Sequence, residues 1–198
     1  MNIKDHKICL AIIILLVIVI IITLIMPAKQ LSTDTYETLD QWILGELTEG
    51  DEVIQTFRPE KSYQRIGLPF ATYSQIIEKG NVIVTITNDK GKEKKVKIKA
   101  SSIIDNEYYY IKYNFKKNRD YEVKITFENL DKPITLKATK KEIKNTTLQV
   151  NDEEQEGNII LSLMYSENNY FNIWYSIFGI TITSSYIALA KERKTHEK

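Results

Sequence analysis

The chain opens with an apolar run from Ile8 to Met26, in which Thr23 is the only polar side chain. At a rise of about 1.5 Å per residue, a helix of this length spans about 28 Å, close to the hydrocarbon thickness of a bilayer. Leucine, isoleucine and valine favour membrane insertion, and no charged side chain opposes them in this run. The pattern predicts a transmembrane helix over residues 8–26, behind a short tail at residues 1–7.

A second uncharged run extends from Tyr170 to Ala190. Serines and threonines dilute its hydrophobicity, but their hydroxyls can bond to helix carbonyls within a membrane. We therefore expect a second transmembrane helix over residues 170–190; the alternative is an amphipathic or buried helix of a soluble domain. The small residues Ser176, Gly179 and Thr183 recur about one turn apart, a spacing that lets another helix approach closely.

Positive residues flank both runs, with Lys4 and Lys7 before the first and the basic tail at residues 191–198 after the second. Such residues stay on the cytoplasmic side, so we expect both termini inside and residues 28–169 outside. The alternative for the first run is a cleaved signal peptide, although the run exceeds the usual apolar core of roughly 7–15 residues. The expected protein crosses the cell membrane twice, with the lipid bilayer as its first partner.

The stretch between the two runs changes its hydrophobic period near Gly50. Residues 27–50 are predicted to form a helical connector, because apolar residues between Asp34 and Leu47 recur at near-helical spacing and Asp34 suits an N-cap. From residue 51 onwards, short β-branched and aromatic segments alternate with polar turns. About eight such strands over residues 51–166 predict an antiparallel β-sandwich. The predicted strands are Val53–Phe57, Arg65–Ser74, Asn81–Asn88, Lys95–Lys99, Tyr108–Phe115, Tyr121–Phe127, Ile134–Ala138 and Asn158–Tyr165.

The predicted sandwich lacks the side chains of the commonest catalytic sites. The single cysteine, Cys9, lies in the first apolar run, and the two histidines, His6 and His196, lie in the tails. A domain without either residue has no disulfide, no thiol nucleophile and no Ser-His-Asp arrangement. The alternative is an envelope hydrolase that uses carboxylates such as Asp105 and Glu107, but no motif supports it. We expect a non-catalytic protein without a cofactor or a catalytic metal.

Charge is distributed unevenly along the chain. Residues 61–144 carry 19 basic and 10 acidic groups, residues 29–60 carry two and eight, and residues 145–169 carry none and five. A solvated lysine-rich surface is the ordinary interpretation, and attraction to anionic envelope polymer or lipid head groups is the functional one. Nucleic acid is not an expected partner, because the domain is predicted to lie outside the cell.

The strand Tyr108–Phe115 offers the best candidate binding residues. Side chains alternate between the faces of a strand, so Tyr109, Ile111, Tyr113 and Phe115 are predicted to face the core. The outward residues are then Tyr108, Tyr110, Lys112 and Asn114. Two tyrosines about 7 Å apart on one face can stack on sugar rings. The alternative is that they cover a second apolar layer or a neighbouring loop.

Two acidic segments could supply oxygen ligands to a cation. Asp105-Asn106 suits a calcium site in chemistry, although an Asx-type turn explains the same pair. The segment Asn151–Gly157 could collect divalent ions weakly, but a disordered, solvated acidic loop is the simpler interpretation. No metal site is therefore predicted.

The order of the strand segments resembles a known family. It begins with QTF at 55–57 and GLPFATYS at 67–74, continues with GNVIVTITNDKGK at 80–92 and ASSIIDNEYYY at 100–110, and ends with DYEVKI at 120–125. This order resembles the galactose-binding-like jelly-roll domain, an extracytoplasmic module of bacterial membrane proteins in surface-polysaccharide and glycosyltransferase systems. The resemblance covers about residues 51–166 and implies a mainly β fold, an antiparallel jelly-roll β-sandwich ectodomain flanked by two transmembrane helices.

The resemblance also implies a role. The protein would bind or scaffold in the cell envelope, with envelope polysaccharide or a membrane glycosyltransferase as its partner. Some domains of this family hold a sugar in loops at one end of the sandwich and a structural calcium nearby, but those loops find no residue-by-residue match here. The alternative is a two-span chain-length regulator of polysaccharide polymerisation, for which a long helical outer domain is expected.

Overall fold

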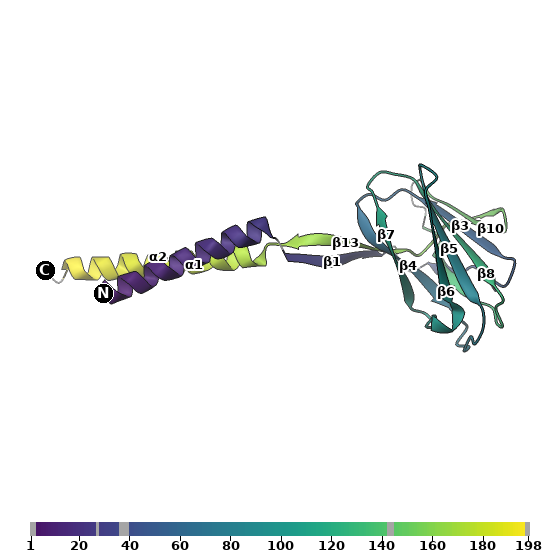
Figure 1. Ribbon diagram of the computed structural model, residues 1–198, viewed down its shortest axis with the longest axis horizontal. Coiled ribbons are helices and arrows are strands. Elements are labelled where there is room, and N and C mark those ends of the chain that lie inside the picture. The colour runs from purple at the N-terminus through teal and green to yellow at the C-terminus, as the bar shows by residue number, and fades with distance from the viewer. Residues whose placement is uncertain (1–2, 27, 36–39, 142–144, 197–198) are drawn as a thin grey trace. The chain divides into compact units, whose positions relative to one another are not determined.

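The computed structural model describes residues 3–26, 28–35, 40–141 and 145–196 of the 198-residue chain. The chain divides into two compact units. One unit comprises Met1–Gln30 with Glu167–Lys198 and contains the helices α1 (Ile3–Ile25) and α2 (Phe171–His196), and the other is Leu31–Ser166. The strands of the second unit carry labels in Figure 1.

Helix α1 is long and apolar enough to cross a membrane. Its segment Lys7–Ile25 has a mean hydropathy of 3.8, and most of its leucines and isoleucines are exposed, as expected where side chains meet lipid. By length and composition it is a membrane span or a signal sequence. Among the described residues no second helix meets the same criteria. Serines, threonines and Asn172 reduce the hydropathy of α2, so the crossing of the membrane by residues 170–190 stays a prediction.

The strands of Leu31–Ser166 form two sheets in the described part of the chain, so the unit is mainly β and sandwich-like. One sheet has the order β1-β13-β4-β9-β12, with β7 also paired to β4 and β2 to β9; the other has the order β11-β10-β3-β8-β5-β6. Figure 1 shows β4 and β7 in one layer and β3, β8, β5 and β6 in the other. The bounds are β1 Ala28–Thr35, β2 Gln41–Ile43, β3 Glu52–Phe57, β4 Tyr63–Ala71, β5 Asn81–Asn88, β6 Glu93–Lys99, β7 Tyr108–Phe115, β8 Tyr121–Glu128, β9 Thr135–Thr139, β10 Thr147–Val150, β11 Glu153–Gln155, β12 Asn158–Ile159 and β13 Ser162–Asn169, with a 3₁₀ turn at Ala100–Ser102.

The core lies between the two sheets and follows from the alternation of apolar residues. On β8, Val123, Ile125 and Phe127 are buried while the residues between them are only half-buried. These side chains meet buried residues of β4, among them Leu68 and Phe70, in one cluster. Burying each such side chain stabilises the fold by about 1.5–3 kcal/mol. The domain has no cysteine, so this packing replaces the disulfides that stabilise many extracellular domains.

The connector predicted to be helical is not a helix. The described part of residues 27–50 contains the strands β1 and β2 and no helix, and residues 36–39 lie outside the described chain. Strand β2 pairs with β9, and Leu47 pairs with Ile134 in an isolated bridge. Leu47 is thereby buried. The prediction of a helix was wrong because strand pairing with a distant segment overrides local helical spacing.

Strand β1 is attached to the sandwich by a polar contact with β4. The Tyr63 hydroxyl donates a hydrogen bond to Asp34 Oδ2 at 2.9 Å, and Lys61 Nζ lies 3.3 Å from the same oxygen. The Lys61 ammonium also lies 4.2 Å from the centroid of the Tyr165 ring, within the range of a cation–π contact. These contacts join β1, β4 and β13 at one edge of their sheet.

Strand β4 lies inside its sheet despite Pro69, which normally indicates an edge strand or a bulge. The strand pairs with β7 on one side. On the other side Gly67 pairs with Ser162 of β13, and Phe70 pairs with Leu136 of β9. Pro69 therefore falls where one partner strand ends and the next begins, and its missing N–H interrupts neither pairing.

The acidic segment Asn151–Gly157 is mostly exposed, as expected, but its first part forms a hairpin instead of a disordered loop. Strands β10 and β11 pair around Asn151-Asp152, whose φ angles are 51° and 65°. Positive φ at both central residues is the signature of a type I′ turn, which asparagine and aspartate tolerate. Asn151 Oδ1 accepts the Glu52 N–H at 2.8 Å, and its Nδ2 donates to Asp51 Oδ1 at 2.7 Å. The turn is thus fixed to the start of β3.

Inward and outward residues alternate on β7 as predicted. Two neighbouring positions of this strand can therefore be compared to test the packing of the core. Phe115 is 1% exposed, whereas Asn114, one residue earlier, is exposed. Phe115→Ala is expected to lower the free energy of unfolding by about 3–5 kcal/mol because it leaves a cavity. Asn114→Ala should change it by no more than about 0.5 kcal/mol. Urea unfolding of residues 31–166, which contain the whole core cluster, measures both; equal effects would contradict this register.

Candidate functional site

A cavity of about 630 Å³ lies between the β5–β6 hairpin and the segment that leads from β7 of one sheet into β8 of the other. We call it the basic cavity, because six cationic side chains and one carboxylate, Glu93, line it. Its other lining groups are asparagine amides and tyrosines, among them Asn88, Tyr113 and Tyr121. The cations are Lys90, Lys92, Lys94, Lys112, Lys116 and Arg119.

Two turns position four of these six cations, and the other two lie on β6 and β7. In the β5–β6 turn, Asn88 Oδ1 accepts the N–H groups of Lys90 and Lys92, both at 3.0 Å, so an Asx-type turn fixes the backbone that carries the two lysines. In the β7–β8 turn, Asn118 has a φ of 57°, and its N–H donates to the Pro59 carbonyl at 2.9 Å. Each turn therefore holds its cations on a fixed backbone.

The basic cavity lies where the two sheets present their edges. In the described pairings, β6 has only β5 as a neighbour and β7 has only β4, and the two strands belong to different sheets. The Lys94 ammonium bridges them by donating to the Lys112 carbonyl at 2.6 Å. The contact between the two edge strands is therefore made by a charged side chain and not by an apolar one.

Few carboxylates in the described domain lie close to the cations of the basic cavity. Among its six cations, only Arg119 has a carboxylate within 4.0 Å in the described chain, with Asp89 Oδ1 at 3.7 Å from its Nη1. Like charges that share a hollow with low-dielectric walls raise the local potential and attract anions. The arrangement favours an anionic ligand.

Tyrosines and amides supply neutral hydrogen-bonding groups beside the cations. The Tyr113 and Tyr121 rings pack edge to face at 5.9 Å, and the Tyr121 hydroxyl accepts the Lys116 N–H at 2.7 Å. Burial raises the pKa of the Tyr113 hydroxyl, and a hydrogen bond from the Asn88 side chain opposes the shift. Tyr113 therefore stays protonated at neutral pH and keeps a hydrogen-bond donor.

The binding residues predicted from the sequence separate into two places. Lys112 and Asn114 line the basic cavity. Tyr108 and Tyr110 do not line it; their rings lie side by side with centroids 6.1 Å apart. Tyr110 is 41% exposed, but its hydroxyl lies 3.0 Å from Ser162 Oγ and its ring covers Gly67 of the neighbouring strand. An aromatic ring above a glycine shields the backbone of a sheet, so Tyr110 has a structural role in the fold.

The contact between Tyr110 and Gly67 can be tested by a double-mutant cycle. A methyl group on Gly67 would lie 2.7 Å from Tyr110 Cε1, so Gly67→Ala is expected to destabilise the domain by about 1–3 kcal/mol. In a Tyr110→Ala background the same change should be milder by at least about 0.5 kcal/mol. Urea unfolding of the four proteins measures the coupling, and strictly additive effects would show that the ring does not cover this glycine.

Asp105 acts as a turn acceptor in this structure. Its Oδ1 accepts the Thr72 N–H at 2.6 Å, and its Oδ2 accepts the Ser74 N–H at 3.2 Å and the Asn106 amide at 2.9 Å. Both oxygens are therefore occupied by donors, and among the described residues no group of three or more candidate metal ligands gathers. The hydrogen bond from Thr72 lowers the pKa of Asp105 below its ordinary value of 3.8, and burial opposes that shift.

The lowered pKa makes the contribution of Asp105 dependent on pH. The ionised carboxylate stabilises the folded state above the ordinary pKa, and this stabilisation is lost as the pH falls through the lower folded-state value. Asp105→Asn is expected to lower the free energy of unfolding at pH 7 by about 1–3 kcal/mol and to flatten its pH dependence below about pH 4. Urea melts from pH 7 to pH 2 test both, with the exposed Glu107→Gln as the control. A D105N protein with an unchanged acid slope would contradict the assignment.

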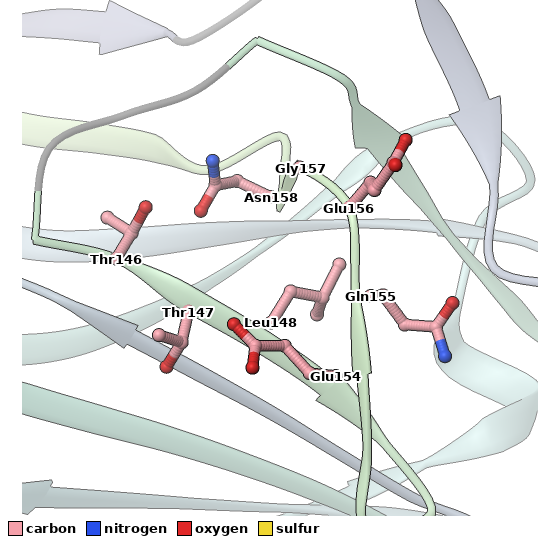
Figure 2. Close-up of a pocket in the computed structure, with 8 residues that line it drawn as sticks. All are labelled: Thr146, Thr147, Leu148, Glu154, Gln155, Glu156, Gly157 and Asn158. Carbon is pink, nitrogen blue, oxygen red and sulfur yellow. The ribbon is translucent and has the colours of Figure 1, made fainter.

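A second hollow, of about 520 Å³, lies beside the β10–β11 hairpin and contains Glu154 and Glu156. Figure 2 shows that these two carboxylates point in different directions instead of converging on one point. Asn158, which lines this hollow, and Gln55 are buried, and Gln55 Nε2 donates to Asn158 Oδ1 at 3.1 Å. Gln55 Oε1 in turn accepts the Ile159 N–H at 2.8 Å. The polar groups behind this hollow satisfy one another, and the hollow has no convergent cation ligands.

The small residues predicted to pack helices lie on one side of α2. Ser176 is 2% exposed, and a Cβ added to Gly179 would lie 2.9 Å from Leu16 Cδ1 of α1. Thr183 is half-buried, and its hydroxyl donates to the Gly179 carbonyl at 2.8 Å. Within this unit, α1 and α2 therefore make contact through these small side chains.

The sequence interpretation missed Lys90, Lys92, Lys116 and Arg119 as members of one site. The signal was present in two turn segments, Asp89–Lys92 and Lys116–Arg119, each of which combines turn-forming residues with two or three cations. Knowing that both turns border one cavity requires the pairing of β5 with β6 and the passage of the chain from β7 into β8. The charge excess was visible in the sequence, but its position was not.

Comparisons with known proteins identify no family. No family model matches the chain, and no curated protein matches it. Among solved structures, a family two carbohydrate esterase from Cellvibrio japonicus aligns with a TM-score of 0.28 and 11% identity, over 67% of this chain and 37% of that one. The flagellar cap protein FliD of Escherichia coli, domains D1 to D3, aligns with a TM-score of 0.21 and 13% identity, over 90% and 68%. Likenesses at these scores carry no argument about function.

Proposed function

We propose that this chain is a non-catalytic, membrane-anchored binding or scaffolding module of the bacterial cell envelope, an accessory of polysaccharide or glycosyl-transfer machinery. The observation that carries the proposal is a basic, solvent-open cavity on a sandwich-like domain whose chain also contains an apolar helix of membrane-spanning length. The resemblance of the strand segments to galactose-binding-like jelly-roll domains supports the connection with polysaccharide, as an analogy of fold.

The chemistry of the described domain supports binding over catalysis. The basic cavity contains lysines, an arginine, amides and tyrosines, with Glu93 as its single carboxylate and no histidine or cysteine. A hydrolase would need a base beside a nucleophile or a pair of convergent carboxylates. Asp105, the carboxylate of the hydrolase alternative, accepts hydrogen bonds from backbone N–H groups and stabilises a turn.

The strand-rich domain also favours the module over a chain-length regulator. That alternative expects a long helical outer domain, whereas the described part of Leu31–Ser166 consists of two sheets with one short 3₁₀ turn. The proposed module has both termini in the cytoplasm and its domain outside, with α1 retained as an anchor and α2 as the second crossing.

This placement can be tested by labelling with an impermeant maleimide on intact cells. In a Cys9→Ser background, a cysteine introduced by Lys92→Cys should be labelled, because residue 92 is exposed on the proposed outer domain. A cysteine introduced by Thr195→Cys should be labelled only after the membrane is permeabilised.

Two outcomes would contradict the proposed placement. Equal labelling of the two cysteines in intact cells would show that the charge-based topology is wrong. A mature N-terminus near Lys29 would show that the first helix is a cleaved signal sequence, which would leave only α2 as an anchor.

A further inference from the structure

We infer that the basic cavity binds an anionic glycan, a sugar polymer that carries carboxylate or phosphate groups. The inference rests on the proposed function, since it takes the domain to meet envelope polysaccharide. It goes further by naming the site, the class of ligand and the residues that select it.

The first argument is that the cations come from both sheets. Lysines on an edge strand are common because they prevent edge-to-edge aggregation, and this protection explains Lys94 together with its neighbours on β6. The same protection covers Lys112, because β7 is also an edge strand. It does not explain Lys90 and Lys92 in the β5–β6 turn, or Lys116 and Arg119 in the segment between β7 and β8. Two separate turns supply positive charge to one hollow, so a role in edge protection accounts for only part of the cluster.

The second argument is that neutral hydrogen-bonding groups lie among the charges. Asn114 is exposed in the cavity, and the Tyr113 hydroxyl is half-buried beside Asn88. Amides and phenols of this kind bond to sugar hydroxyls, while the ammonium and guanidinium groups bind the acidic substituents. A ligand that is both hydroxylated and acidic uses both sets of groups.

The third argument is the shape of the site. A hollow of about 630 Å³ lies in the range of about 300–1,000 Å³ that small-ligand sites occupy. A flat bilayer surface would touch its rim but would leave the interior amides and tyrosines unused. Single-stranded nucleic acid stacks its bases on open aromatic faces, whereas the Tyr113 and Tyr121 rings pack against one another and against Phe115. The geometry favours a glycan chain entering the hollow.

Calorimetric binding to the full-length protein in phosphatidylcholine nanodiscs tests the inference. The probes are oligogalacturonate, which carries carboxylates, poly(glycerol phosphate), which carries phosphates, and neutral dextran of similar length. The cavity variant is Lys90→Gln/Lys112→Gln/Lys116→Gln, which removes charge from the β5–β6 turn, from β7 and from the segment that follows β7. The matched control is Lys79→Gln/Lys95→Gln/Lys99→Gln, which removes the same charge from exposed positions outside the cavity.

We expect at least one acidic probe to bind, dextran to bind more weakly or not at all, and salt to weaken the binding. The cavity variant should bind that probe at least about tenfold more weakly, because charge-assisted hydrogen bonds are lost. The control variant should stay within about twofold of the unmodified protein, and comparison of the two acidic probes identifies the preferred acidic group.

Several results would overturn the inference. Equal weakening in the two variants would show attraction by net charge alone, and equal affinity for dextran would remove the role of the cations. Tighter binding to phosphatidylglycerol vesicles than to either polymer would assign the cavity to lipid head groups. If neither acidic probe binds while the cysteine labelling still places the domain outside, the glycan site fails and the proposed membrane module stands.

Discussion

The fold depends on burial between two sheets in a domain whose sequence has no cysteine and therefore no disulfide. A strand places successive side chains on opposite faces, so a single apolar layer forms only where the alternation is kept on every central strand. The inward residues of β4, β5 and β8 are almost completely buried. On β8 the residues between them are half-buried, whereas β4 and β5 also bury outward residues such as Pro69 and Ile83. The outward positions of β8 are thereby free to carry charge. The lysine-rich character of the surface and the apolar character of the core are two consequences of the same period.

At the edges of the two sheets, the contacts differ from the apolar contacts of the core. Strand β6 ends one sheet and β7 ends a branch of the other, and open edges invite pairing with other chains. Here the Lys94 ammonium reaches across to the Lys112 carbonyl, so the gap between the edges is closed by a polar contact. A polar closure leaves a hollow beside it, because lysine side chains repel one another and do not pack like apolar ones. The protection of these two edges therefore accounts for part of the basic cavity, and the two turns beside it supply the remaining cations.

The strands that were predicted well from the sequence are those whose burial pattern is local. The observed bounds of β5 and β7 coincide with the predicted Asn81–Asn88 and Tyr108–Phe115, because β-branched and aromatic residues alternate there without interruption. Strands β2, β10 and β11 were missed because they are short, and their identity comes from partners: β9 for β2, and β3 for β10. The spacing of Tyr36, Leu39, Trp42 and Ile43 suggested a helix. The pairing of β2 with β9 and the bridge of Leu47 with Ile134, both distant in the sequence, contradict it. The candidate site shows the same limit, since Lys112 and Asn114 were found on one strand while the cations of the two turns needed the tertiary structure.

The structure shows where the uneven charge of the chain is located. Some lysines on the faces of the sheet lie beside carboxylates, as in the contacts of Lys97 on β6 with Glu128 on β8 and of Lys124 on β8 with Glu52 on β3. The partner of Lys124 comes from the adjacent strand, and that of Lys97 comes from the second strand along, across β5. The cavity cations lie on edge strands and in the turns beside them. In the described chain, the only ion pair between one of these cations and a carboxylate is that of Arg119 with Asp89. Their positive charge is therefore left for solvent or a ligand to balance, and it is concentrated in a hollow rather than spread over the faces of the sheets. This contrast between lysines paired on the face of a sheet and cavity cations that mostly lack a carboxylate partner in the described chain is the physical basis for treating the cavity as a site.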